Sequence, residues 1–189
     1  MKKVVTMILA TLALAASGSV FAASATVEYG DARGVDGSSS TNNVSLTVRE
    51  NINQSFVGDV QIFNASSQTT GAETFTRYEA GVTGTTAPLV GPVSFYTRTA
   101  IGQKYTNTTN FGYYSVEPGL SAPLGAGFSA KVAFRFRSAF DAGNNDTTRT
   151  IRAGVAYDLT PKDQIGVRYD DMRGYPNQNI TSVNYTRGF

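Results

Sequence analysis

Hydrophobic and polar residues alternate with a period of two along most of the chain after residue 23. The alternation is clearest near residues 127–139, where Phe128 and Phe134 share one face and Lys131 and Arg135 share the other. Alternating runs of about ten residues, separated by Gly, Asn, Ser, Thr or Pro, are typical of antiparallel strands joined by turns. We predict ten strands, near 24–33, 42–50, 56–64, 73–83, 93–104, 110–120, 127–139, 147–159, 164–172 and 179–189.

The strand count depends on the segment 110–120, which Pro118 interrupts. Eight strands fit the pattern if the hairpin near 84–120 is partly loop, and twelve are also compatible. Turns near 51–55, 84–92, 121–126 and 160–163 then lie at one end, and loops near 34–41, 65–72, 105–109, 140–146 and 173–178 lie at the other. Such spacing predicts an all-β sandwich or barrel.

The direction of the apolar face separates a water-soluble barrel from a membrane barrel, in which that face meets lipid. The polar faces carry many charges, and each would cost several kcal/mol in lipid. These charges are Glu28, Arg49, Asp59, Arg77, Glu79, Arg98, Glu117, Lys131, Arg135, Arg137, Arg152, Asp158, Arg168 and Asp170. The opposite faces carry Tyr29, Tyr78, Phe95, Tyr114, Phe128, Phe134, Phe136, Tyr157, Tyr169, Tyr185 and Phe189. We therefore predict an antiparallel, up-and-down transmembrane β-barrel with its charges inside.

The N-terminus predicts export. Lys2 and Lys3 precede a short apolar run, and Val20 and Ala22 fit a small-residue cleavage site. We expect a signal peptide over 1–22 and a barrel domain over 23–189. The chain has 16 basic and 14 acidic residues, so removing Lys2 and Lys3 leaves a neutral protein. A neutral chain disfavours nucleic acid as a partner.

The C-terminus predicts an assembly signal. Phe189 is the last residue, and Tyr185, Val183 and Thr181 precede it at alternating positions, with Arg187 between. This pattern resembles the terminal signature of bacterial outer-membrane β-barrels. The resemblance implies that the barrel-assembly machinery reads Tyr185 and Phe189. It also implies a location in the cell outer membrane, in contact with lipid and lipopolysaccharide.

The residue inventory disfavours catalysis. The chain has no His and no Cys, which rules out a Ser–His or Asp–His arrangement and leaves only oxygen ligands for a metal. Asp170 and Asp171 are adjacent on a strand and point to opposite faces, so they cannot act as an acid–base pair. Asp141 and Asp146 flank an Asn-rich segment that reads as a turn rather than a Ca²⁺ site. We predict no catalytic residue, no metal site and no cofactor.

The inward face predicts a channel. Its basic residues are the candidate solute-binding set: Arg77, Arg98, Lys131, Arg135, Arg137, Arg152 and Arg168. A hairpin centred near residues 143–144 would place Arg135 opposite Arg152, and like charges in that position need bridging acids or attract anions. Glu79 and Glu117 are the candidate bridging acids. Ten strands at about 40° tilt give a backbone radius of roughly 10 Å, which leaves room for a narrow pore.

The short loops, regular strands and inward arginines resemble the oligogalacturonate-specific porins, which are narrow monomeric barrels of twelve strands. The resemblance implies a monomeric porin-like channel that passes small or anionic solutes, including acidic oligosaccharides. Two alternatives stay open at the level of sequence. One is a closed structural or adhesive outer-membrane barrel without transport. The other is a soluble periplasmic β-barrel or sandwich that acts as a binding module.

Overall fold

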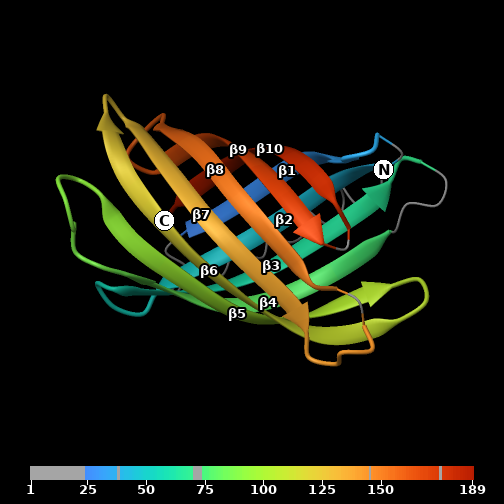
Figure 1. The fold of residues 1–189 in the computed structure, drawn as a ribbon. Coiled ribbons are helices and arrows are strands. Elements are labelled where there is room, and N and C mark those ends of the chain that lie inside the picture. Colours follow the sequence, from blue (N-terminus) through green and yellow to red (C-terminus); the bar gives the residue numbers. More distant parts are fainter. Residues whose placement is uncertain (1–23, 38, 70–73, 145, 175) are drawn as a thin grey trace.

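The computed structural model describes residues 24–189 except 38, 70–73, 145 and 175, so the predicted leader over 1–22 lies outside the described residues. The described chain forms one closed antiparallel barrel of ten strands (Figure 1). Its strands are β1 (Ser24–Gly34), β2 (Ser40–Asn51), β3 (Phe56–Ser67), β4 (Phe75–Thr85), β5 (Ser94–Thr106), β6 (Asn110–Gly125), β7 (Phe128–Ala139), β8 (Thr148–Asp158), β9 (Asp163–Gly174) and β10 (Gln178–Gly188). Within this part of the chain, no helix is long and apolar enough to cross a membrane.

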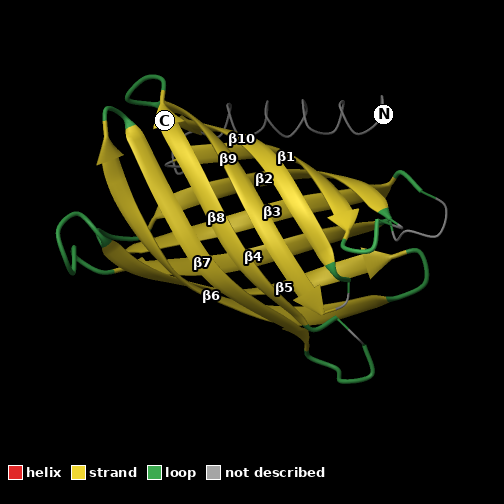
Figure 2. Cartoon of the chain, turned by 45° about the horizontal axis from the view of Figure 1, so that its top comes forward, coloured by secondary structure: helices red, strands yellow, loops and turns green. Residues whose placement is uncertain are grey.

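Every strand pairs with its neighbours in the sequence, and β1 closes the barrel against β10. Because Ser24 pairs with Gly188, the start of β1 and the end of β10 lie at the same end of the barrel, which we call the terminal end. The β2–β3, β4–β5, β6–β7 and β8–β9 connections share that end. The other five connections lie at the opposite end, which we call the loop end (Figures 1 and 2). This is the predicted up-and-down topology.

The pairing registers set the width of the barrel. Following them once around the ten strands advances along the chain by about 12 residues, which corresponds to a tilt of about 40° and a backbone radius of about 10 Å. A barrel of this size holds two facing layers of long side chains. The interior is therefore narrow enough for residues on non-adjacent strands to touch.

The apolar side chains face outward, as the alternation predicts. Phe134, Val155 and Val167 are 45%, 48% and 55% exposed, while the intervening Ala133 and Arg135 are buried. Buried positions include many polar residues, among them Asp59, Glu79 and Asp170. An apolar exterior around a polar interior is the arrangement of a barrel that crosses a membrane, not that of a water-soluble barrel.

The predicted turn near 121–126 is wrong. β6 continues to Gly125, and only residues 126 and 127 separate it from β7. Ala126 and Gly127 both have positive φ, 50° and 80°, as a tight hairpin turn matched to the strand twist requires. Pro118 does not end the strand: it pairs with Thr97 of β5, and the register toward β7 resumes at Gly119. Proline lacks an N–H, so it interrupts one ladder locally without breaking the other.

Two inward glycines each accommodate a tyrosine ring from the facing strand. Gly102 pairs with Tyr113, and a Cβ on Gly102 would stand 2.5 Å from the Tyr113 ring and 2.6 Å from a backbone oxygen. Gly119 likewise pairs with Tyr96, and its Cβ would stand 2.5 Å from that ring. The rings therefore lie flat against the inner wall. Tyr113 is fully buried there and reaches the charged residues at the centre.

Candidate functional site

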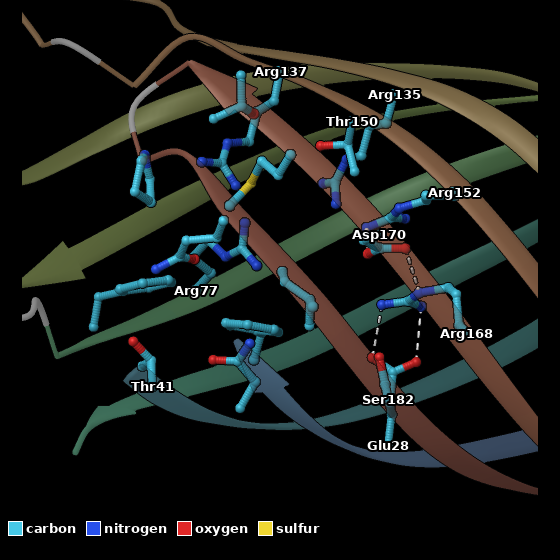
Figure 3. Close-up of a pocket in the computed structure, with 18 of the residues that line it drawn as sticks. Glu28, Thr41, Arg77, Arg135, Arg137, Thr150, Arg152, Arg168, Asp170 and Ser182 are labelled. Carbon is cyan, nitrogen blue, oxygen red and sulfur yellow. Dashed lines mark hydrogen bonds and ion pairs between the residues drawn. The ribbon is translucent and has the colours of Figure 1, made fainter. Parts of the chain in front are cut away.

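The inside of the barrel contains a cavity of about 220 Å³ that extends from the loop end toward the middle. Five of the predicted arginines line it: Arg77, Arg135, Arg137, Arg152 and Arg168. Their side chains converge on the same space from β4, β7, β8 and β9 (Figure 3). These residues are far apart in the sequence. They meet because each occupies an inward position on its strand and the strands surround the same cavity.

A first cluster of charges is centred on Glu79 of β4. Arg98 of β5 donates to Glu79 at 2.5 Å, and its other nitrogens donate to Asp59 of β3 at 2.5 and 2.9 Å. Arg135 Nη2 of β7 and the Tyr113 hydroxyl of β6 both donate to Glu79 Oε2, at 2.6 and 2.9 Å. The carboxylate thus binds groups from three other strands, and only 4% of Glu79 is exposed.

A second cluster continues the charge pattern around the barrel. Arg168 of β9 contacts Glu28 of β1 at 2.8 Å and Asp170 at 2.9 Å (Figure 3). Arg152 of β8 lies 3.3 Å from Asp170 and 2.6 Å from Glu117 of β6. Cations and carboxylates alternate in this cluster, so a carboxylate lies between Arg152 and Arg168. We call the two clusters together the central charge layer. Five of its residues also line the cavity: Glu28, Arg135, Arg152, Arg168 and Asp170.

The predicted pairing of Arg135 with Arg152 is wrong. Arg135 pairs with Thr150, and Arg152 pairs with Ala133, because the β7–β8 hairpin closes one residue earlier than predicted. This register keeps the two guanidinium groups off directly facing positions, where like charges would destabilise the sheet. The bridging acids were predicted correctly: Glu79 holds Arg135, and Glu117 holds Arg152.

A loop residue supplies a further carboxylate on the loop-end side of the central charge layer. Asp146, in the β7–β8 connection, is 1% exposed and contacts Lys104 at 3.1 Å and Arg137 at 2.9 Å. Asp141 in the same loop accepts a hydrogen bond from the Gly143 backbone at 2.9 Å, as in an Asx turn. The two predicted turn aspartates therefore differ: Asp141 shapes the loop, and Asp146 folds into the barrel.

Arg77 of β4 differs from the other arginines of the cavity. Its guanidinium lies 4.1 Å from the ring centre of Phe63 and 5.3 Å from that of Phe75. Among the described residues it makes no ion pair, and its Nε has no hydrogen-bond partner. Arg77 is 8% exposed and lines the cavity. The aromatic rings hold it in place electrostatically but leave its positive charge without a carboxylate.

The remaining predicted residues lie away from the cavity. Arg98 belongs to the central charge layer, and Lys131 is on the inward face of β7 nearer the terminal end, where it is exposed. Lys104, Asp146, Phe63 and Phe75 were not in the predicted set. Lys104 shares the inward alternation of Arg98, so sequence alone could have included it. Asp146 gave no such signal, because loop residues have no periodicity.

No family model matches the chain, and no curated protein matches it. Among solved structures, the barrel is similar to a NanC porin, with a TM-score of 0.58, 12% identity, and 87% of this chain and 100% of that chain covered. The translocator domain of the autotransporter NalP from Neisseria meningitidis matches with a TM-score of 0.54, 9% identity, and 98% and 96% coverage. A KdgM porin in complex with disordered oligogalacturonate matches with a TM-score of 0.50, 10% identity, and 87% and 99% coverage.

At these identities the similarity establishes the fold. The fold is that of a small outer-membrane barrel. The structural neighbours include porins, which are channels rather than enzymes. The closed barrel, its apolar exterior and these neighbours support an outer-membrane location and a porin-like architecture. The identity of a solute does not follow from them.

Proposed function

We propose that this protein is a monomeric outer-membrane channel for small anionic solutes, and that its basic lumen residues bind the solute during passage. The observation that carries the proposal is Arg77, a buried cation in the cavity that has no carboxylate partner among the described residues. A buried charge without a counter-ion is costly, and an entering anion would offset that cost. Arg77 is therefore the cavity residue at which we expect an entering anion to bind.

The path continues through the central charge layer. There Arg135, Arg152 and Arg168 share their carboxylates, so a solute anion can exchange with Glu79, Glu117 or Glu28 without leaving a cation unpaired. Lys131 then offers a solvent-exposed cation on the side of the terminal end. A series of cations whose carboxylate partners can be exchanged for the solute favours entry and still permits release.

Acidic oligosaccharides are the solute class that we put first. The structurally similar KdgM porin was determined with oligogalacturonate, a chain of carboxylate-bearing sugars. In this chain the aromatic rings of Phe63 and Phe75 lie beside Arg77 in the cavity wall, and carbohydrate recognition commonly combines flat apolar surfaces with charged groups.

Planar-bilayer recording tests the proposal. Purified, folded protein under a salt gradient should give a reversal potential with anion preference. Arg77→Gln should lower the anion-to-cation permeability ratio at least twofold, whereas Arg77→Lys should retain most of it. Lys162→Gln is the matched control, because it removes one positive charge from an exposed turn at the terminal end. Absence of any current from the folded wild-type protein would overturn the proposal.

Arg135 and Arg152 are less suitable targets for charge reversal. Replacing both with Glu, which the sequence alone would recommend as a test of ion preference, places new carboxylates against Glu79 and Glu117. Such variants would combine a selectivity change with a loss of stability. Arg77 separates the two effects, because it holds no acid in place among the described residues.

The central charge layer also favours a second candidate function, a closed structural barrel. Glu79 and Asp170 are 4% and 1% exposed, so their ion pairs fill the middle of the interior. A closed barrel would give no current in bilayers. A channel would conduct before any substitution. The same recordings therefore distinguish the two candidates.

Export and assembly complete the proposal. The segment 1–22 is removed as a signal peptide, and the barrel-assembly machinery recognises Tyr185 and Phe189 at the end of β10. The terminal end then faces the periplasm and the loop end faces outward. Both side chains are exposed on the outer surface of the barrel at the terminal end, which supports this role.

A further inference from the structure

The outer surface of the barrel carries a group of arginines at the loop end, away from the lumen. Arg149 of β8, Arg173 of β9 and Arg33 of β1 are exposed, and each alternates with buried neighbours that face the interior. The strands β8, β9, β10 and β1 are consecutive in the barrel. The three side chains therefore project from one continuous sector, which we call the arginine rim.

The arginine rim begins where the apolar band of this sector ends. On β8, Ile151 gives way to Arg149 at the next outward position, and on β9, Tyr169 gives way to Asp171 and then Arg173. On β1, Tyr29 gives way to Asp31 and Arg33. Tyrosines at the edge of an apolar band mark the membrane interface of such barrels. The rim therefore lies at the level of the lipid headgroups.

Two arginines of the rim face each other without a bridging acid between them. Arg149 and Arg173 are direct cross-strand partners, a position in which like charges repel. Asp171 contacts Arg173 at 2.7 Å, and Asp31 contacts Arg33 at 2.8 Å. Arg149 has no side-chain hydrogen bond or ion pair with any described residue. Asp171 therefore compensates Arg173 but not Arg149, and an anion from outside the protein would offset the repulsion between the two arginines.

A groove lies beside the arginine rim on the same outer surface. Its volume is about 550 Å³, and it is lined by Tyr29, Asp31, Arg33, Asn179, Thr181, Ser182 and Val183. It runs from the charged level at Arg33 to the apolar level at Tyr29 and Val183, along the seam between β1 and β10. The groove is charged on the side of the loop end and apolar on the side of the terminal end. This distribution matches a lipid that has an anionic headgroup and apolar acyl chains.

We propose that the arginine rim binds the phosphorylated headgroup of lipopolysaccharide, with one acyl chain in the groove between β1 and β10. The phosphate accepts hydrogen bonds from Arg149 and Arg173 together and relieves their repulsion, because guanidinium groups bind phosphate oxygens in pairs. Arg33 lies at the upper edge of the groove and contacts the same headgroup. This inference rests on the outer-membrane orientation given under the proposed function, but not on channel activity.

Native mass spectrometry of the folded, full barrel in detergent tests the inference, with diphosphorylated lipid A as the probe. The wild-type protein should retain lipid A, and the double variant R149Q/R173Q should bind it at least fivefold more weakly. R149K/R173K keeps both charges but loses the paired guanidinium hydrogen bonds, so it should bind more weakly than wild type and more tightly than R149Q/R173Q. Arg187→Gln is the matched control, because Arg187 is also an outward arginine but lies at the terminal end.

The probe series separates the phosphate from the acyl chains. Lipid A without phosphates should bind as weakly to the wild-type protein as diphosphorylated lipid A binds to R149Q/R173Q. Equal binding of the two lipids, or equal binding by wild type and R149Q/R173Q, would overturn the inference. Heat-modifiable migration on gels confirms that each variant is folded before it is measured. A barrel that conducts anions yet binds lipid A without these arginines would overturn this inference alone.

Discussion

Arg135 of β7 donates a hydrogen bond of 2.6 Å to Glu79 of β4, although two other strands separate them along the barrel wall. The contact crosses the interior and is possible because the barrel is narrow and both side chains are long. Glu79 also receives Arg98 and Tyr113, so one carboxylate joins β4 to β5, β6 and β7. The centre of the barrel is thus held by charge pairing where a soluble protein would have an apolar core.

Replacing Glu79 tests how much this pairing stabilises the barrel. Glu79→Gln removes a negative charge that Arg98 and Arg135 share, and it leaves both guanidinium groups short of a counter-ion. We expect the free energy of unfolding to fall by about 3–5 kcal/mol. Urea titration in detergent micelles, followed by β-sheet circular dichroism, measures the change. Glu50→Gln, at an exposed position near the end of β2, should change stability by less than about 0.5 kcal/mol.

The fit between Gly102 and Tyr113 gives a second prediction. A Cβ at residue 102 would displace the Tyr113 ring, whose hydroxyl binds Glu79. Gly102→Ala should therefore destabilise the barrel by about 1–3 kcal/mol, in spite of the better strand propensity of alanine. Gly58→Ala is the control, since its Cβ would meet only ordinary contacts, the nearest at 3.5 Å from Ile52. Equal urea midpoints for the two variants would show that the ring moves without cost.

The fold could be predicted from sequence because its main signal is local. Residues such as Phe134 and Arg135 alternate regardless of what the rest of the chain does, and that alternation gave the strands, the outward face and the bridging acids Glu79 and Glu117. The register of β7 against β8 could not be obtained in this way, because it depends on how the 140–147 loop folds. The same loop places Asp146 inside the barrel. Contacts across the lumen, such as Arg77 on Phe63, require the closed geometry.

The C-terminal residue gives a prediction about assembly in cells. Deletion of Phe189 should lower the amount of heat-modifiable protein in the outer-membrane fraction several-fold, because the assembly machinery would lose its terminal aromatic residue. Refolding of the purified variant in detergent should be unchanged, since Phe189 follows the last strand and is 45% exposed on the surface. Phe56→Ala removes an outward aromatic residue at the same end on β3 and should retain its yield within about twofold. If the Phe189 deletion and Phe56→Ala both lowered the amount of folded protein in the outer-membrane fraction, the result would indicate a general need for interfacial aromatic residues.

The orientation of the two faces of β8 can be tested with a matched pair of lysines. Val155 is 48% exposed on the outer surface, whereas Ala156 lies on the inward face. Val155→Lys places a charge against lipid and should destabilise the barrel in bilayers by about 2–4 kcal/mol. Ala156→Lys adds the same side chain to the polar interior and should change stability by less than 1 kcal/mol, about the size expected for a surface change.

The comparison between these two lysine variants is sharper than either value alone. They share the added charge and the strand and lie at neighbouring positions, so the main difference between them is the face on which the charge is placed. If the protein were a soluble barrel, Val155→Lys would again be the more destabilising variant, because Val155 would then belong to a dry centre, but the gap between the two variants would not depend on lipid. Urea unfolding from lipid vesicles, with detergent micelles as a second environment, therefore measures how the gap depends on the medium outside the barrel. A smaller gap in micelles than in vesicles would identify lipid as the cause.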